Sequence, residues 1–306
     1  MQMRQTNWSI GVPLVALVVV LLFVAPVTAA EGVSADEIKR IDPMYADADP
    51  LDRPPSLVDD LHASVIATYF YGSAKGNLQT PAGGKRGTTS ANRPTFKDVG
   101  IDTANIGDVE ARLGLGPAQE VFVGAQFIRL GGDARLSRQL ISQGMTFPAS
   151  TAVSSTVRMD WYRVGYRYSF VLDETDKGVS TLLLTPLADV LFWDFDYELT
   201  GGSRNVSRSY VKVGAQLGLE LTWRPNGGNF WIDAGAASFP QIRSVPNVST
   251  EHITLHYRFY RGRHFDMTGS LGFAAEQQAF KDDQKLPNHQ SADFGPLLQV
   301  GLQVDF

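Results

Sequence analysis

The sequence predicts an all-β fold: a closed antiparallel transmembrane β-barrel of about ten strands. Three observations support this prediction. Apolar residues recur at every second position in many separate segments, the connections between these segments alternate between short and long, and the last residues of the chain form one more alternating segment. A barrel of about eight or twelve strands remains compatible, because the weak regions around Ile101 and Met145 could hide a further pair.

The composition of the chain fits this fold class without requiring it. The 306 residues include no cysteine, which excludes disulfides and a cysteine-linked lipid anchor. A formal charge of -5 gives no reason to expect a nucleic-acid partner. The hydrophobic fraction of 43% is low for a protein with several membrane helices, but it suits a barrel in which only alternate residues face lipid.

The first 30 residues read as a secretory signal peptide. Arg4 is the only charged residue before Glu31, residues 10–27 are mostly apolar, and the small residues Ala29 and Ala30 precede Glu31. The apolar run is long, so a retained membrane anchor is the competing interpretation. Residues 31–58 are acidic and contain several prolines, which predicts a periplasmic extension, with a docking segment as the alternative. The barrel is expected to span residues 59–306.

Ten alternating segments predict the strands of the barrel. The clearest runs from Val211 to Trp223, with apolar residues at odd positions and polar residues or glycine at every position between them. A strand with one apolar face and one polar face suits a wall between lipid and a polar lumen. The segments are residues 63–71, 109–115, 121–127, 162–170, 187–197, 211–223, 230–236, 253–259, 267–273 and 298–306.

One of these segments changes phase. Between residues 181 and 197, apolar residues stand at even positions up to Val190 and at odd positions from Leu191 onward. A β-bulge would shift the pattern by one residue and reconcile the two parts. Asp194 and Asp196 would then face the lumen. The aromatic residues expected to form rings at the two membrane interfaces are Tyr69, Tyr71, Trp161, Tyr162, Tyr168, Phe170, Trp193, Tyr197, Trp223, Phe230, Tyr257 and Phe259.

The final strand carries a family resemblance. Leu302, Val304 and Phe306 alternate with polar residues, and Phe306 ends the chain. This resembles the C-terminal signature of bacterial outer-membrane β-barrels, in which a terminal Phe closes an amphipathic strand. The resemblance implies an exported monomer in the outer membrane, with its C-terminus in the periplasm. It also implies contact with outer-membrane lipid, lipopolysaccharide and the barrel-assembly machinery.

The connections agree with that orientation, because outer-membrane barrels have short periplasmic turns and longer outside loops. Short connections are expected at residues 116–118, 172–178, 224–228 and 261–263. Long connections are expected at residues 72–107, 131–151, 198–206, 240–250 and 276–290. The first long connection contains Lys75, Lys85, Arg86, Arg93 and Lys97, so it could touch anionic lipopolysaccharide.

If the apolar faces meet lipid, charged residues of both signs must line the lumen. This mixture predicts a salt-bridged interior that rigidifies a closed barrel. A narrow passive pore for small polar solutes is the alternative, although a selective pore would favour a ring of one sign. The expected lumen-lining residues are Glu110, Arg112, Arg163, Arg167, Lys212, Glu220, His256, Arg258 and Asp266, with Asp305 at the end of the chain.

Two short motifs offer weak catalytic candidates. Asp194 and Asp196 resemble the Asp-x-Asp pair of the omptins, ten-stranded outer-membrane proteases that also need an Asp-x-His pair at the outer rim. The Asp-x-His spacing here, Asp60 to His62, falls at the opposite, periplasmic end. His289 and Ser291 are similar to the His-x-Ser of outer-membrane lipid A deacylases, but that family follows the Ser with Asn where this chain has alanine.

No metal or cofactor is predicted from the spacing of residues. His252 and His256 stand four apart, which on a strand places them on one face without forming a compact pair. The leading functional hypothesis is therefore a non-enzymatic envelope protein with a structural or surface-contact role. A passive pore comes second, and a surface lipid A deacylase or omptin-like protease comes third.

Overall fold

The computed structural model describes residues 61–80, 91–116, 118–174, 181–225, 229–240, 242, 244–283 and 287–306. The predicted signal peptide and the predicted extension at residues 31–58 lie outside these ranges. No helix within the described ranges is long and apolar enough to cross a membrane.

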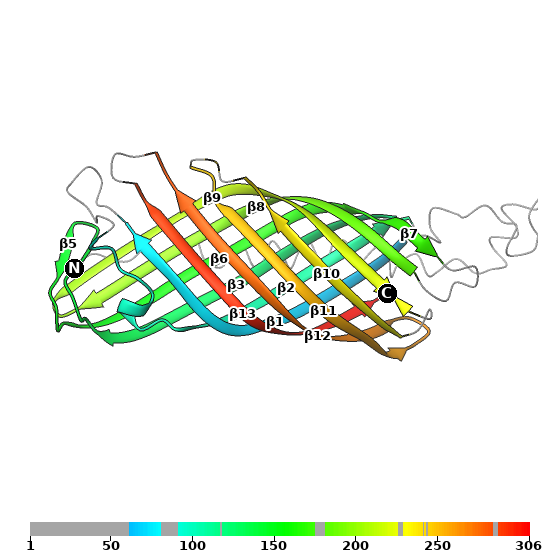
Figure 1. The fold of residues 1–306 in the computed structure, drawn as a ribbon, viewed down its shortest axis with the longest axis horizontal. Helices are drawn as coiled ribbons and strands as arrows, with labels where there is room; N and C mark the ends of the chain where they lie inside the picture. Colours follow the sequence, from blue (N-terminus) through cyan, green and yellow to red (C-terminus); the bar gives the residue numbers. More distant parts are fainter. Residues whose placement is uncertain are drawn as a thin grey trace, which may run out of the picture.

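The described residues form one closed antiparallel barrel of ten strands, which confirms the predicted fold class (Figure 1). Each strand pairs with the next along the chain, and the pairing of β1 with β13 closes the ring. A short strand, β7, continues β6 and pairs with β8. The strands are β1 (Leu61–Gln79), β2 (Thr103–Leu115), β3 (Gln119–Arg135), β6 (Ala152–Tyr168), β7 (Phe170–Glu174), β8 (Thr181–Gly201), β9 (Arg204–Arg224), β10 (Phe230–Ser238), β11 (Asn247–Arg261), β12 (Asp266–Lys281) and β13 (His289–Asp305).

The barrel has two unlike ends. At the terminal end, β1 begins, β13 ends and the short connections turn the chain. At the loop end lie the 3-10 helix η3 (Lys97–Val99) and a small hairpin of β4 (Leu140–Ser142) and β5 (Met145–Phe147). Figure 1 shows β5 at the end opposite the C-terminus. We call the two corresponding parts of the barrel the terminal half and the loop half.

One connection differs from the prediction. Residues 198–206 were expected to form a long loop, but β8 and β9 continue to pair as far as Gly201 and Arg204. Only Gly202 and Ser203 remain to turn the chain, and Gly202 adopts a left-handed φ of 60° that suits glycine. The predicted long loop is therefore a tight turn between two strands of 21 residues each.

The outer wall of the terminal half is a belt of exposed apolar side chains. Leu217 and Phe273 expose 59% and 60% of their surface, and polar residues on the same strands point inward. A closed barrel with such a belt satisfies its backbone hydrogen bonds internally and offers hydrocarbon an apolar surface. This is the architecture of a β-barrel that spans a membrane.

The pattern inverts in the loop half, where apolar side chains face inward. On β8, Trp193, Phe195 and Tyr197 are at most 1% exposed, while Asp194 and Asp196 between them stand on the outer face. The register of β8 with β6 and with β9 is continuous, so the predicted β-bulge is wrong. At the phase change, the apolar face of β8 switches from the outside of the barrel to the inside. The backbone of the strand continues without a bulge.

The length of the strands explains this inversion. A strand of about 9–11 residues crosses the hydrocarbon, so β8 and β9 are about twice as long as a crossing requires. The surplus extends beyond the bilayer, where water bathes the outer wall and the hydrophobic effect drives apolar side chains inward. Asp194 and Asp196 therefore face outward, contrary to the prediction. Trp161, Trp193 and Tyr197 are likewise buried inside and do not form an interfacial ring.

The inward side chains of the loop half form a continuous apolar core. The indole of Trp193 lies 5.9 Å from the rings of Tyr210 and Phe280, measured between ring centroids. Nearly every strand contributes a buried residue, and Phe96 and Val99 enter the core from the connection between β1 and β2. The strand contributions include Leu78, Ile106, Ile128, Met159, Trp193, Val206, Val248, Phe280 and Phe294.

An ion pair fastens the two largest described connections to each other. Arg138, which follows β3, donates from Nη2 to Asp98 Oδ2 at 2.6 Å and to the carbonyl of Arg93 at 2.9 Å. The hydroxyl of Thr95 also donates to Asp98 Oδ2 at 2.7 Å. Burial alone would raise the pKa of Asp98, but these hydrogen bonds outweigh it, and the pKa lies below its ordinary value.

We predict that Phe195→Ala destabilises the barrel much more than Phe192→Ala. Phe195 is fully buried, so its truncation should lower the free energy of unfolding by about 3–5 kcal/mol. Phe192 faces outward on the same strand, so its truncation should lower the free energy of unfolding by much less. Denaturant unfolding in detergent micelles measures both values. Equal losses would contradict the inward placement of Phe195.

We predict that Asp98→Asn loosens the two connections that Asp98 and Arg138 hold together at the loop end. Because the pKa of Asp98 is depressed, its stabilising contribution is present at neutral pH and lost as the pH falls through that pKa. Hydrogen exchange of amides 95–101 should be less protected in Asp98→Asn at neutral pH. Wild-type protection should fall toward the variant's value in acid. Identical protection at neutral pH would refute the role of the ion pair.

Candidate functional site

A polar cavity of about 330 Å³ lies inside the barrel, where the inner wall of the terminal half is rich in charged side chains. The outward apolar belt dictates this arrangement, because residues alternate between the two faces of each strand. Six of the predicted lumen-lining residues line it: Glu110, Arg112, Arg163, Arg167, Glu220 and His256.

The other predicted lumen residues lie beyond the cavity, toward the loop end or toward the terminal end. Lys212 faces inward under the apolar core, with its ammonium 5.4 Å from the centre of the Phe280 ring. Arg258 pairs with Asp266 at 3.1 Å near the terminal end, where β11 meets β12. Asp305 ends β13 and accepts a hydrogen bond from the amide of Gln303 at 2.5 Å.

One side of the cavity is a network of three arginines and three carboxylates, which we call the arginine network. Glu110 is its centre: its buried carboxylate lies 2.6 Å from Arg112, 2.7 Å from Arg163 and 3.0 Å from Arg167. Asp108 lies 3.2 Å from Arg163, and Glu120 lies 3.4 Å from Arg167. Positive and negative groups thus balance one another within the network.

A glycine lets the network form across three strands. Gly124 on β3 pairs with Glu110 on β2 and with Arg163 on β6. A Cβ at Gly124 would lie 2.8 Å from Nε of Arg163, so a side chain there would obstruct the guanidinium on its way to Glu110. The absence of a side chain on the middle strand therefore allows a contact between strands that are not neighbours.

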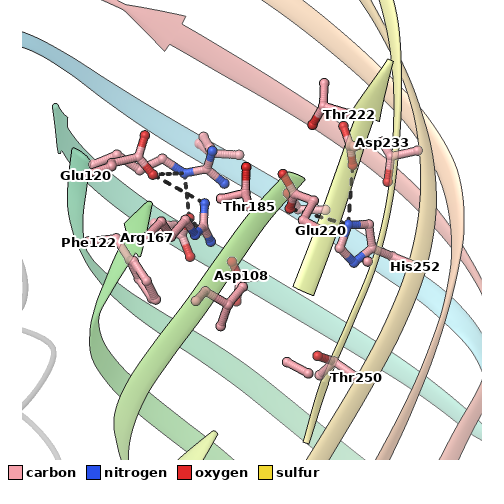
Figure 2. A pocket seen from close by; sticks show the side chains of 18 of the residues that line it. Asp108, Glu120, Phe122, Arg167, Thr185, Glu220, Thr222, Asp233, Thr250 and His252 are labelled. Carbon is pink, nitrogen blue, oxygen red and sulfur yellow. Dashed lines mark hydrogen bonds and ion pairs between the residues drawn. The ribbon is translucent and has the colours of Figure 1, made fainter. Parts of the chain in front are cut away.

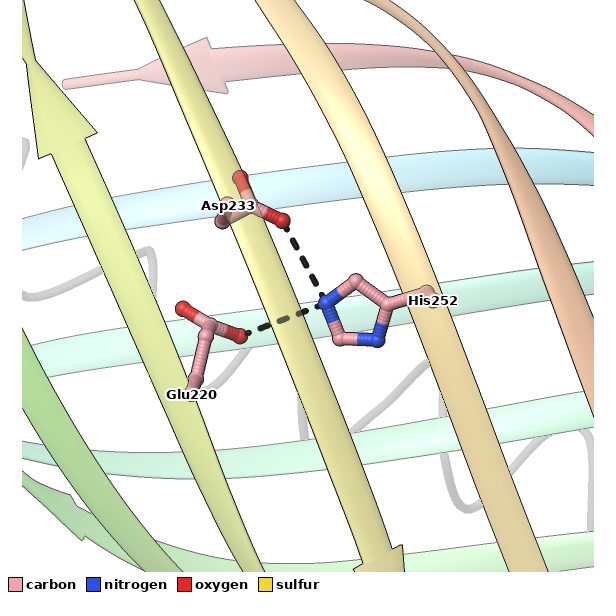
Figure 3. Close-up of side chains that lie close together, drawn as sticks. All are labelled: Glu220, Asp233 and His252. Atoms are coloured by element: carbon pink, nitrogen blue, oxygen red, sulfur yellow. Dashed lines mark ion pairs between the residues drawn. The ribbon is translucent and has the colours of Figure 1, made fainter.

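The other side of the cavity holds Glu220, Asp233, His252 and His256, which we call the histidine cluster. Nε2 of His252 lies 3.3 Å from Asp233 Oδ2 and 3.7 Å from Glu220 Oε2 (Figure 3). Nε2 of His256 contacts the other oxygen of Asp233. Figure 2 shows Glu120 and Arg167 on one side of the cavity and Asp233 and His252 on the other.

Sequence reasoning missed two members of this cluster. Asp233 and His252 stand in separate short segments, and only the pairing of β10 with β9 and β11 brings them beside Glu220. Finding the cluster would have required the register of these three strands, and the local sequence pattern does not reveal that register. The spacing of His252 and His256 alone gave no indication of a site.

The first pair of catalytic candidates lies outside the barrel. Asp194 and Asp196 stand on the outer wall of the loop half, where Nη2 of Arg158 lies 3.0 Å from Asp194 and 3.7 Å from Asp196. One guanidinium engages both carboxylates, and the pair stands on the outer wall, away from the polar cavity. Of the Asp-x-His spacing, Asp60 lies outside the described residues, and His62 stands at the terminal end of β1.

The second pair lies at the loop end of β13, with different contacts for each residue. Nδ1 of His289 lies 3.4 Å from Nη1 of Arg93. The hydroxyl of Ser291 accepts a hydrogen bond from the amide of Asn77 at 2.5 Å. A Ser nucleophile needs its hydroxyl directed at a base, whereas these contacts engage the two side chains with separate neighbours.

The end of the chain completes the barrel seam. The backbone N–H of Phe306 donates to the carbonyl of Ala63 at 2.8 Å. The side chains of Leu302 and Phe306 are exposed on the outer wall, at 41% and 44%, and Val304 shares their face. Recognition of these residues by the assembly machinery stays a prediction.

Comparisons with known proteins return fold likenesses only. No protein-family model matches the chain, and no curated protein matches its sequence. Among solved structures, the attachment invasion locus protein Ail of Yersinia pestis is 12% identical, with a TM-score of 0.35 over 81% of this chain and 99% of that one. The outer membrane protease OmpT of Escherichia coli is 8% identical, with a TM-score of 0.37 over 83% and 99%.

The outer membrane protein OprG of Pseudomonas aeruginosa is 9% identical, with a TM-score of 0.27 over 81% of this chain and 96% of that one. These three proteins differ in what their names state, and one of them is a protease. At such low identities and TM-scores, none of them transfers a function to this chain.

We predict that Glu110→Gln strongly destabilises the barrel. The change removes the charge shared by three arginines in a buried site, and breaking such a pair costs about 3–5 kcal/mol. Asp194→Asn, which weakens an ion pair on the outer wall, should cost about 0–1 kcal/mol. Denaturant midpoints in micelles compare the two variants. A cost for Glu110→Gln no larger than that for Asp194→Asn would show that the network is not a stabilising centre.

Proposed function

We propose that the chain is a bacterial outer-membrane protein that neither conducts solutes nor catalyses a reaction. In this proposal, the connections at the loop end form a rigid surface that is displayed outside the cell. In this orientation the terminal end faces the periplasm and the loop end faces outward. The short connections at the terminal end support that choice, because outer-membrane barrels have short periplasmic turns.

The apolar core of the loop half carries this proposal. Its side chains come from nearly every strand, and the largest are at most 2% exposed. Ions and polar solutes would have to pass through this tightly packed, mainly apolar layer, where an unpaired charge is strongly disfavoured. We therefore expect the apolar core to close the polar cavity of the terminal half on the side of the loop end.

The arginine network argues against the passive pore as well. A selective pore favours a ring of one sign, whereas Asp108, Glu110 and Glu120 here face three arginines across short distances. Paired groups of this kind hold the wall together and leave little net field for a permeating ion.

A surface-contact role fits the loop end. Arg138 and Asp98 hold the connections in a fixed arrangement, so contact residues would be presented without a large loss of entropy on binding. Lys75 on β1 and Lys97 in η3 are both exposed at this end. Anionic lipopolysaccharide is the chemistry that such cations would meet.

Single-channel recording in a planar bilayer tests the proposal. Purified wild-type protein, shown to be folded by heat-modifiable gel mobility, should give no discrete conductance steps. A variant with Trp193→Ala and Phe280→Ala, which thins the apolar core, should give measurable steps or flicker if it folds.

Reproducible steps from the wild-type protein would overturn the proposal and favour the passive pore. Variants Asp194→Asn and Ser291→Ala address the enzymatic alternative. Each should leave any hydrolysis of peptide or lipid A at the level of the wild type. Hydrolysis that the wild type performs and either variant abolishes would favour an enzyme.

A further inference from the structure

We propose that Glu220, Asp233 and His252 bind a divalent transition-metal ion inside the barrel, with Zn²⁺ as the best fit. In this proposal, His256 is a positioning residue that holds Asp233. The site lies on the wall of the polar cavity, and its existence does not depend on whether the barrel conducts.

The spacing of the three donor atoms already approaches that of a metal site. One nitrogen of His252 and one oxygen each from Glu220 and Asp233 all lie within 4.8 Å of one another. The nitrogen lies 3.3 Å and 3.7 Å from the two oxygens. Zn²⁺ with bonds of about 2.0–2.2 Å places tetrahedral ligands about 3.4 Å apart, so both nitrogen–oxygen separations are already close to those of a metal site.

A glycine makes room for this arrangement. Gly235 on β10 pairs with Glu220 on β9 and with His252 on β11, so it stands between them on the middle strand. A Cβ at this position would lie 2.7 Å from Cε1 of His252. The imidazole therefore occupies the space that any other residue would fill, and it reaches Glu220 across β10 and Asp233 on β10 itself (Figure 3).

His256 supplies the support that metal ligands commonly have. Its Nε2 contacts Oδ1 of Asp233, which leaves Oδ2 directed at His252. The ring of His256 is stacked on Trp231 with centroids 5.0 Å apart and an angle of 1° between the planes. Such an outer partner orients the carboxylate before an ion arrives.

The donor groups of the site suit a cation. A single nitrogen of His252 faces two carboxylates, and its one N–H can point directly at only one of them at a time. A divalent ion would bind all three groups at once. One imidazole with two carboxylates suits Zn²⁺ and similar transition metals better than Mg²⁺ or Ca²⁺, which prefer oxygen ligands alone.

Direct binding of Zn²⁺ tests the site. Refolded protein in micelles, first treated with a chelator, is titrated with Zn²⁺ against a chromogenic chelator. The wild type should bind one ion per chain. His252→Ala and Glu220→Gln should each weaken binding at least tenfold, and Gly235→Ala should weaken it although it removes no ligand.

Asp266→Asn is the matched control, because Asp266 is an inward carboxylate paired with Arg258 elsewhere in the lumen. It should bind Zn²⁺ as the wild type does. Heat-modifiable mobility identifies the variants that are folded, and only folded variants are compared. Failure of the wild type to bind one ion, or undiminished binding by folded His252→Ala or folded Glu220→Gln, would overturn the proposal.

Discussion

The structure depends on one constraint: the outer wall of the barrel touches two different solvents. Residues of a strand alternate strictly between the two faces, so the solvent outside decides what remains for the inside. Hydrocarbon around the terminal half draws apolar residues outward and leaves Glu110 and Glu220 within. Water around the loop half draws Asp194 outward and leaves Trp193 within. The long strand β8 runs through both halves of the barrel, and its pairing with β9 shows no shift of register.

The polar interior depends on a second, local device, a glycine on the middle of three strands. Gly124 lets Arg163 reach Glu110, and Gly235 lets His252 reach Glu220. Buried charges need partners in good geometry, and a barrel wall offers few partners on adjacent strands alone. Removing one Cβ brings the second neighbour within reach, and both charged clusters of the cavity are built in this way.

Much of this fold could be predicted from the sequence, because alternation is a local signal. The segment from Val211 to Trp223 shows its two faces directly, and the lumen positions of Glu110 and Arg163 follow from the same pattern. Alternation cannot reveal which face points inward, so Trp193 and Tyr197 are expected at a membrane interface although they belong to the core. The histidine cluster required the register of three strands, a non-local property that neither Asp233 nor His252 carries alone.

Tryptophan quenching in lipid vesicles tests the inversion most directly, because tryptophans occupy both outer and inner walls. Variants that retain only Trp193 or only Trp223, with phenylalanine at the other tryptophan positions, are exposed to brominated lipid and to aqueous iodide. Trp223 is 45% exposed on the apolar belt and should be quenched by the lipid, whereas Trp193 is buried and should be shielded from both quenchers. Quenching of Trp193 by either one would place it on the outer wall and contradict the apolar core.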